Sequence, residues 1–181
     1  MRRDERTRLS RRLAYVLRHH PEQAGVTLDP DGWASVAQVV AGVPGLTRER
    51  LVEIVATDAK GRYSLDVDGD RVRAVQGHSA GVADQLHHTS VVPPPVLFHG
   101  TTRTNVEAIL AEGLEAGRRS HVHLSADPET AATVGRRRGL EVVLQVDAAA
   151  AHAAGVEFFL AENGVWLVPG TVPARFLRLT G

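Results

Sequence analysis

Apolar residues near the start of the chain recur three and four residues apart, the spacing typical of the buried side of an amphipathic helix. These positions are Leu9, Leu13, Val16 and Leu17. Pro21 must end such a helix, because proline has no amide hydrogen to donate. In the stretch LAYVLRHHP, residues 13–21, the helix therefore finishes on one arginine and two histidines. Cations at this end stabilise the helix dipole by roughly 0.3 to 1 kcal/mol, so the cluster has a structural explanation besides any functional one.

Two more helices and a hairpin are predicted before residue 90. Ser35 and Thr47 are expected to cap the helices. Their apolar positions again follow helical spacing: Val36, Val39 and Val40 in one, Leu51, Ile54 and Val55 in the other. Residues 25–33 predict a short extended piece and a turn, and residues 62–75 alternate around an Asp-Gly turn, which indicates a hairpin. Three helices followed by a hairpin is the order of a winged-helix module.

The pattern changes after the stretch HHTSVVPPPV, residues 87–96, so we expect one lobe over residues 1–90 and another over residues 91–181. In the second lobe Thr104 is expected to cap a helix that Gly113 stops, and Pro128 to stand in the first turn of a helix over residues 127–139. Strands are predicted at residues 96–100, 121–125, 140–146, 156–160, 164–168 and 175–179. The expected fold class is α+β.

Composition excludes several classes of chemistry. The 181 residues contain no cysteine, which rules out disulfides, a thiolate zinc site and a cysteine nucleophile. The charged start MRRDERTRLSRR is not followed by an apolar run, and no apolar stretch approaches the length that spans a membrane. We therefore expect a cytoplasmic protein without a membrane partner.

Charge is balanced over the chain but not along it. There are 21 basic and 21 acidic residues, which argues against a protein that coats nucleic acid through a large basic field. The first twenty residues nevertheless hold seven arginines against Asp4 and Glu5, and Lys60 is the only lysine. Genomic base composition explains the preference for arginine equally well. Whatever its cause, arginine supplies a planar fork suited to phosphate.

Candidate polar residues of the second lobe follow or occupy predicted strands. In FHGT, residues 98–101, Gly100 allows a close backbone approach to a ligand, and His99 and Thr101 flank it. In HVHLS the alternation places three polar side chains on one face: His121, His123 and Ser125. Taken singly, a histidine in such a strand is more often a hydrogen-bonded structural residue than a catalyst. Two histidines at this spacing can reach one metal ion, but no HExxH motif and no carboxylate in this strand accompanies them, so we expect no metal site.

Cationic residues gather beside turns and element ends, although a charged hairpin is usually only a solvated face. The set comprises Arg18, His19, Lys60, Arg62, Arg73, Arg118, Arg119 and the GRRRG run. No pair of carboxylates is spaced for acid and base work, and no GxSxG elbow is present. A site built from these groups handles anions by electrostatics rather than by proton transfer.

Seven motifs in this order resemble the NAD-dependent RNA 2'-phosphotransferases across nearly the whole chain. They are LSRRLAYVLRHHPEQAGVTLDPDGW, KGRY, RAVQGHS, FHGT, RSHVHLSAD, TAATVG and ENGVWL. One departure is visible, because the family usually has a GxRHG-like segment where this chain has GRRRG, with Arg138 in place of the histidine. The resemblance favours a phosphate pocket as the explanation of the cations at residues 18–20.

The resemblance implies an N-terminal winged-helix-like lobe that binds RNA and a C-terminal lobe like those of ADP-ribosyltransferases. It implies removal of an internal RNA 2'-phosphate, such as the one left by certain tRNA splicing ligations. The phosphate would attack NAD+ and expel nicotinamide, and the RNA-2'-phospho-ADP-ribose intermediate would then yield RNA with a 2'-hydroxyl and ADP-ribose 1'',2''-cyclic phosphate. By motif, the family's essential residues correspond to Arg18, His19, Arg62 and Arg119.

The resemblance also assigns binding residues. The NAD+ turn corresponds to His99, Gly100 and Thr101, with Ser125 on the neighbouring strand, and the expected RNA contacts are Lys60, Arg73 and His78. Whether His19 donates or accepts a proton stays open. Two other functions remain: a general ADP-ribosyltransferase acting on protein or on nucleic-acid phosphate ends, and a winged-helix regulator with a ligand-sensing lobe. We expect a monomer whose partners are the 2'-phosphorylated RNA and NAD+.

Overall fold

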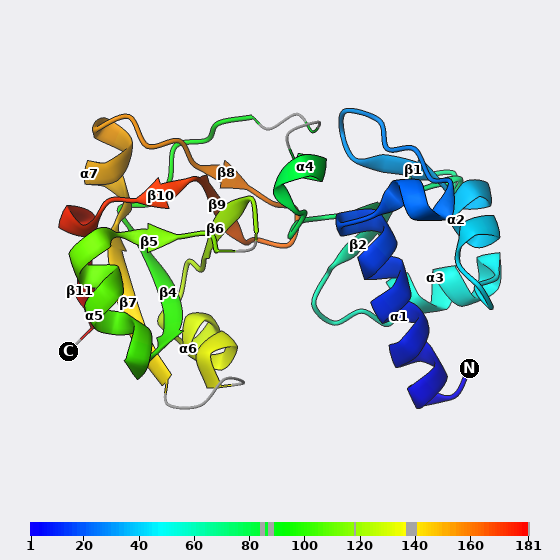
Figure 1. Cartoon of the computed structure of the whole chain (residues 1–181), viewed down its shortest axis with the longest axis horizontal. Helices are drawn as coiled ribbons and strands as arrows, with labels where there is room; N and C mark the ends of the chain where they lie inside the picture. Colours follow the sequence, from blue (N-terminus) through cyan, green and yellow to red (C-terminus); the bar gives the residue numbers. More distant parts are fainter. Residues whose placement is uncertain (84–85, 87–88, 118, 137–140, 181) are drawn as a thin grey trace. The chain divides into compact units, whose positions relative to one another are not determined.

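The structure is a computed structural model that describes every residue except 84–85, 87–88, 118, 137–140 and 181. Its contacts divide the chain into two compact units, Met1–His87 and His88–Gly181 (Figure 1). Each unit has its own apolar core, one drawn from residues 9–74 and the other from residues 97–177. The units are therefore considered one at a time.

Unit 1 follows the predicted order of helices and hairpin (Figure 1). Its elements are α1 (Arg3–Arg18), the 3-10 turn η1 (Pro21–Ala24), β1 (Trp33–Ser35), α2 (Val36–Gly42), α3 (Arg48–Ala56), β2 (Tyr63–Leu65), β3 (Arg71–Ala74) and α4 (Ala80–Ala83). The predicted hairpin is confirmed, with Tyr63 opposite Ala74. The strand β1 was not predicted: Trp33 pairs with Arg73, so β3 lies between β1 and β2 in an antiparallel sheet.

Helix α1 forms as its apolar spacing predicts. Leu9, Leu13 and Leu17 are each at most 1% exposed and belong to the core of unit 1. The helix ends before Pro21, where the amide of His19 donates to the carbonyl of Tyr15 at 3.0 Å. Burial of leucines on one side thus fixes which side of α1 faces outward.

The two predicted caps of unit 1 differ in outcome. Thr47 caps α3 through its side chain, which accepts a hydrogen bond from the amide of Arg50 at 3.3 Å. Ser35 occupies the N-cap position of α2, but its side chain makes no capping hydrogen bond. Ser35 thus takes the predicted position without the predicted hydrogen bond, while the amide of Val36, the first helical residue, donates to the carbonyl of Asp70 at 2.8 Å.

Unit 2 holds three small antiparallel sheets with helices beside them (Figure 1). Its elements are β4 (Val96–Thr102), α5 (Arg103–Glu112), β5 (Leu114–Glu115), β6 (His121–Leu124), α6 (Pro128–Arg136), β7 (Glu141–Asp147), α7 (Ala148–Ala153), β8 (Phe159–Leu160), β9 (Trp166–Pro169), β10 (Thr171–Val172), the 3-10 turn η2 (Ala174–Phe176) and β11 (Leu177–Leu179). The strand orders are β11-β7-β4, β6-β9-β8 and β10-β5. The α+β class is confirmed by both units.

Two local predictions for unit 2 need correction, and one helix was not predicted. Thr102, not Thr104, is the N-cap residue of α5, because β4 extends as far as Thr102 and the helix begins at the next residue. The strand predicted at residues 156–160 is confined to Phe159–Leu160, since the amide of Val156 donates to the carbonyl of Ala151 and closes α7. Helix α7 itself was not predicted, although Asp147 accepts from the amide of Ala150 at 3.0 Å and caps an alanine run.

Gly113 ends α5 as predicted, and its neighbours explain why glycine is needed. Its φ is +105°, which other residues rarely adopt. A Cβ there would lie 2.8 Å from the carbonyl oxygen of Val172. Glycine thus lets the chain turn close against β10. No helix within the described residues is both long and apolar enough to cross a membrane.

Candidate active site

The end of α1 meets the turn at residues 76–79 within unit 1. The backbone amide of Ser79 donates to the carbonyl of Arg18 at 2.9 Å. Gly77, with φ +87°, lies so close that a Cβ there would be 3.4 Å from Nη1 of Arg18. The structure therefore brings together two motifs, LRHH and QGHS, that are separated by about sixty residues. His78 is buried in this turn, so its contact with RNA remains a prediction.

Arg62 is held by a carboxylate that the sequence analysis missed. Its Nη1 donates to Asp58 Oδ1 at 2.6 Å, and its backbone amide donates to Asp58 Oδ2 at 2.5 Å. The Asp58 side chain is 5% exposed, whereas that of Arg62 is 36% exposed. Asp58 thus fixes one end of the guanidinium while more than a third of the arginine side chain faces solvent. The available signal was an aspartate four residues before the arginine, in a turn.

Tyr63 shows that Arg18 and Arg62 act on the same region of unit 1. The ring is buried, and its hydroxyl donates to the carbonyl of Ser10 at 2.7 Å. Burial raises the pKa of Tyr63, while a hydrogen bond with Ser10 and the charges of Arg18 and Arg62 oppose the rise. Two arginines from distant motifs and the carboxylate of Asp58 therefore all act on this one buried hydroxyl.

The remaining predicted RNA contacts of unit 1 have different surroundings. Arg73 on β3 lies over the ring of Trp33, with 4.4 Å between the guanidinium carbon and the ring centroid, and donates to the carbonyl of Asp31 at 3.1 Å. This stacking gives Arg73 a structural role in addition to the predicted one. Lys60 is exposed in the turn before β2.

In unit 2 the predicted NAD+ residues come together where β4 meets the end of β6. Phe98 and Ser125 exchange backbone hydrogen bonds of 2.9 and 2.8 Å, which joins the two strands. Next to this bridge, Nδ1 of His99 lies 2.9 Å from the carbonyl oxygen of His123. Thr101 is buried on the same strand. His99 and Ser125, assigned from motifs 26 residues apart, are therefore neighbours.

The chemistry of His99 follows from its surroundings. Burial lowers the pKa of His99, and the positive charge of Arg119 lowers it further, against a hydrogen bond to His123 that raises it. Because a carbonyl oxygen only accepts, Nδ1 carries the hydrogen. The neutral ring therefore presents Nε2 as an acceptor, suited to a ligand hydroxyl rather than to an anion.

The histidines of β6 fit the structural alternative. His121 is buried, its Nδ1 lies 2.6 Å from the hydroxyl of Ser120, and its ring meets the edge of Phe159 at 5.7 Å between centroids. His123 uses Nδ1 to donate to the carbonyl of His121 at 3.0 Å. Across the part of the chain that the structure describes, no three histidine, aspartate or glutamate residues gather as a metal site would require.

The four predicted catalytic residues are divided between the units. Arg18, His19 and Arg62 belong to unit 1, and Arg119 belongs to unit 2, where it is exposed and acts on His99. Arg118 and Arg138 lie outside the described residues. No residue of unit 2 other than Arg119 was predicted to be catalytic.

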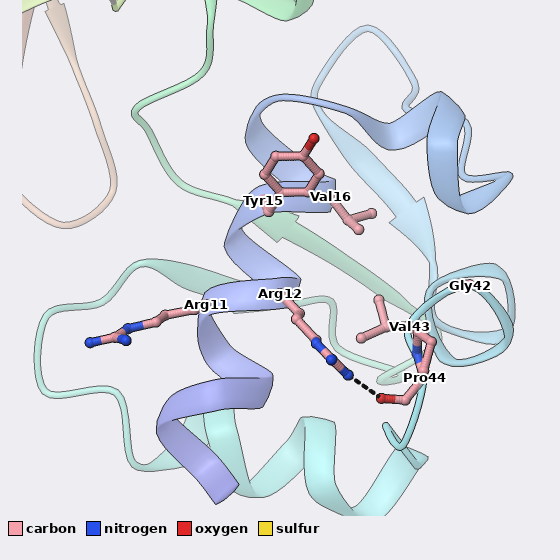
Figure 2. Close-up of a pocket in the computed structure, with 7 residues that line it drawn as sticks. All are labelled: Arg11, Arg12, Tyr15, Val16, Gly42, Val43 and Pro44. Carbon is pink, nitrogen blue, oxygen red and sulfur yellow. Dashed lines mark hydrogen bonds between the residues drawn. The ribbon is translucent and has the colours of Figure 1, made fainter. Parts of the chain in front are cut away.

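A pocket on the flank of α1 contains none of the predicted site residues. It has a volume of about 260 Å³ and is lined by Arg11, Arg12, Tyr15, Val16, Gly42, Val43 and Pro44 (Figure 2). Nη1 of Arg12 donates to the carbonyl of Pro44 at 3.2 Å across it. Sequence reasoning missed these residues, although the arginine-rich start of the chain was a signal.

Replacing Arg119 by alanine is expected to raise the pKa of His99 towards its usual value, because a repelling positive charge is removed. The pKa of His99 is lower in the folded than in the unfolded chain, so the neutral ring contributes to the free energy of unfolding. This contribution is fully present above about pH 6.5, the usual pKa of histidine, and is lost as the pH falls through the folded-state pKa. The Arg119→Ala variant should therefore lose less stability on acidification. NMR titration of the His99 ring protons measures the shift, with Arg178→Ala on β11 as the control. An unchanged titration would show that Arg119 does not act on His99.

Comparison with known proteins gives one consistent result. The profile of the family described as RNA 2'-phosphotransferase, Tpt1 / KptA family matches residues 4–170. A probable RNA 2'-phosphotransferase of Burkholderia lata is 48% identical over 176 residues, which cover 95% of this chain and 90% of the relative. One of Pseudomonas syringae is 47% identical over 181 residues, covering 98% and 96%. One of Streptomyces coelicolor is 46% identical over 183 residues, covering 98% and 97%.

Similarity of this extent, over both units and every motif, identifies the class of protein: the chain is an enzyme, a transferase. It belongs to the RNA 2'-phosphotransferase family described as Tpt1 / KptA. The resemblance drawn from the seven motifs is thereby confirmed.

Proposed function

We propose that this enzyme removes an internal 2'-phosphate from RNA by transferring it to NAD+. The products are RNA with a 2'-hydroxyl, ADP-ribose 1'',2''-cyclic phosphate and nicotinamide. The observation that carries the proposal is the cationic set of unit 1, in which Gly77 packs against the guanidinium of Arg18 and Asp58 holds the guanidinium of Arg62. The sequence offers no pair of carboxylates spaced for acid and base work. Such a site suits a phosphate that is bound first and then transferred.

The architecture supports a division of labour between the units. Unit 1 has the order helix, strand, helix, helix and hairpin, and its first strand joins the sheet of the hairpin. We interpret this order as a winged-helix module and assign RNA binding to it. We assign NAD+ binding to unit 2, as an ADP-ribosyltransferase-like lobe. The predicted RNA contacts Lys60, Arg73 and His78 belong to unit 1. A cytoplasmic monomer is the form in which we expect the enzyme to act.

The residues of unit 2 fit NAD+ as a co-substrate. NAD+ would contribute a ribose carbon that carries nicotinamide as a leaving group. The neutral His99 ring can accept a hydrogen bond from a ribose hydroxyl through Nε2. Gly100, as the residue between His99 and Thr101, lets a ligand approach the backbone of β4 closely. Ser125, bridged to Phe98, offers a hydroxyl from the neighbouring strand.

In the first step the arginines position a nucleophile that needs no activation. The RNA 2'-phosphate is already an anion, so an oxygen of it can bond to the ribose carbon without a general base. The bond to nicotinamide breaks at the same time, and its electron pair leaves with the neutral base. Arg18 and Arg62 contribute by holding the phosphate in line, which converts an encounter into a positioned reaction.

The second step requires neutralisation of charge. The ribose 2''-hydroxyl oxygen bonds to phosphorus, the bond from phosphorus to the RNA 2'-oxygen breaks, and the hydroxyl proton ends on that oxygen. Negative charge builds up on the phosphoryl oxygens, and the family resemblance assigns its neutralisation to the guanidinium groups of Arg62 and Arg119. His19, next to Arg18, is the residue in this set that can carry the proton between the two oxygens.

The proposed function is tested with a synthetic oligonucleotide that carries one internal 2'-phosphate. We expect loss of that phosphate only when NAD+ is present, with nicotinamide and ADP-ribose 1'',2''-cyclic phosphate formed in equal amounts. The same oligonucleotide with a 2'-hydroxyl is the control. Transfer of ADP-ribose to protein or to a terminal phosphate, with the 2'-phosphate left intact, would identify a general ADP-ribosyltransferase. Binding to duplex DNA of defined sequence without NAD+ turnover would identify a regulator.

A further inference from the structure

The outward side of α1 carries two arginines that form no ion pair in the described chain. Arg8 and Arg11 are exposed, and within the described chain neither makes an ion pair or a hydrogen bond. Tyr15 is 46% exposed on the same side. The spacings from 8 to 11, from 11 to 15 and from 15 to 18 are three, four and three residues, so these side chains share one face with Arg18. We call Arg8, Arg11 and Tyr15 the α1 basic face.

Other arginines on α1 and on the neighbouring helix α3 form ion pairs or hydrogen bonds within unit 1. Arg6 lies 3.9 Å from Glu53, and Arg50 of α3 lies 3.0 Å from Glu5, so the sides of α1 near α3 are ion-paired. Figure 2 shows Arg12 turned towards Pro44, whereas the guanidinium of Arg11 points away from Pro44. On the outward side of α1, Arg8 and Arg11 therefore keep their positive charge without an ion pair in the described chain.

The N-terminal segment that contains this face is positively charged, whereas the whole chain has no net charge. Seven arginines and two carboxylates lie in the first twenty residues of a protein with 21 basic and 21 acidic residues, so the rest of the chain is acidic overall. Unneutralised cations on a helix repel one another, so a solvated face normally intersperses charges of both signs. An anionic partner removes this repulsion.

Tyr15 adds a second kind of contact to the cations. Its hydroxyl donates to Gln23 Oε1 at 3.2 Å, and its ring lies 4.9 Å from that of His20 between centroids. The ring is thus held in place while nearly half of the residue is exposed. A fixed, exposed aromatic ring between cations is the arrangement on which bases of a single strand stack.

We propose that the α1 basic face binds the single RNA strand that flanks the 2'-phosphate. This inference rests on the proposed function, in which Arg18 and His19 at the end of the same helix receive that phosphate. Ten residues of helix separate Arg8 from Arg18, or about 15 Å along the axis. Tyr15, which lies between Arg18 and Arg11 along the helix, stacks on a base next to the site, and Arg11 and Arg8 contact successive backbone phosphates leading away from it.

The test compares two probes in equilibrium binding: a 2'-phosphorylated dinucleotide and a ten-residue single-stranded RNA with a central 2'-phosphate. The double variant Arg8→Ala/Arg11→Ala should bind the dinucleotide as the wild type does. For the longer RNA, the slope of log affinity against log salt should become less steep by about 0.7 for each lost phosphate contact, or about 1.4 in total. Tyr15→Ala should weaken the longer RNA about fivefold or more.

The exposed Arg178 on β11 supplies a matched control, because Arg178→Ala removes the same charge from unit 2. Equal affinity of wild type and double variant for the longer RNA, with equal salt slopes, would overturn the inference. So would a wild type that binds both probes equally well. If the wild type binds the longer RNA through Arg8 and Arg11 but never removes its 2'-phosphate, the proposed function fails and the RNA face stands.

Discussion

Arg62→Ala and Arg119→Ala are expected to slow the second chemical step more than the first, so that RNA-2'-phospho-ADP-ribose accumulates. In the first step the arginine contacts hold the phosphate in ground state and transition state alike, and binding shared by both does little for the rate. In the second step the phosphate is the electrophile, and charge develops where the arginines act. Each lost charge-assisted hydrogen bond is worth roughly 1.5 to 3 kcal/mol, or about tenfold to a hundredfold in rate.

A denaturing gel of end-labelled RNA, sampled over time, resolves substrate, intermediate and product. Arg71→Ala is the control for Arg62, because Arg71 is likewise paired with an aspartate, Asp66 at 3.0 Å, but was not predicted to belong to the site. Arg62→Lys should retain part of the activity, since Asp58 can still hold a cation there. Equal slowing of both steps, with no intermediate band in either alanine variant, would leave these arginines as residues that only position the substrate.

Phe158→Ala is expected to destabilise unit 2 by about 3 to 5 kcal/mol while leaving unit 1 folded. Phe158 is the largest fully buried side chain of its core and is 0% exposed. Its ring meets His152 edge-on at 6.2 Å, and its carbonyl accepts from the amide of Val91 at 2.8 Å. Removing the ring leaves a cavity among residues that belong to unit 2 alone, because the two cores share no member.

Leu13→Ala is the matched change in unit 1, where Leu13 is 0% exposed and its loss costs about 2 to 5 kcal/mol. Amide hydrogen exchange followed by mass spectrometry reads the two units separately. Phe158→Ala should lower protection in residues 96–179 and Leu13→Ala in residues 3–74. Loss of protection over both units in either variant would show that the cores unfold as one.

Local sequence determined much of this protein. The spacing of Leu9, Leu13 and Leu17 was enough for α1, and Thr47 and Gly113 marked the start of α3 and the end of α5. These signals depend on neighbours within one or two helical turns, so they can be seen without a tertiary structure. Motif order likewise identified the family, and with it the site residues that are proposed here.

Local sequence did not predict the hydrogen bonds that backbone groups make with distant parts of the chain. Ser35 occupies the N-cap position of α2 without a capping hydrogen bond, and the amide of Val36 donates to the carbonyl of Asp70, which lies about thirty-five residues further along the chain. Residues 33–35 form a strand only because β3, some forty residues later, pairs with them. A short segment carries too little periodicity to show that it will be paired.

The chemical state of the candidate site was decided by tertiary structure alone. Asp58 holds Arg62 through a turn, and Gly77 passes beside Arg18, sixty residues away in sequence. His99 is neutral because burial and the charge of Arg119 lower its pKa, and its hydrogen lies on Nδ1 because a carbonyl of β6 stands there. Burial and the distance between charges are properties of the folded chain, and a pKa depends on both, so residue type and spacing do not specify them.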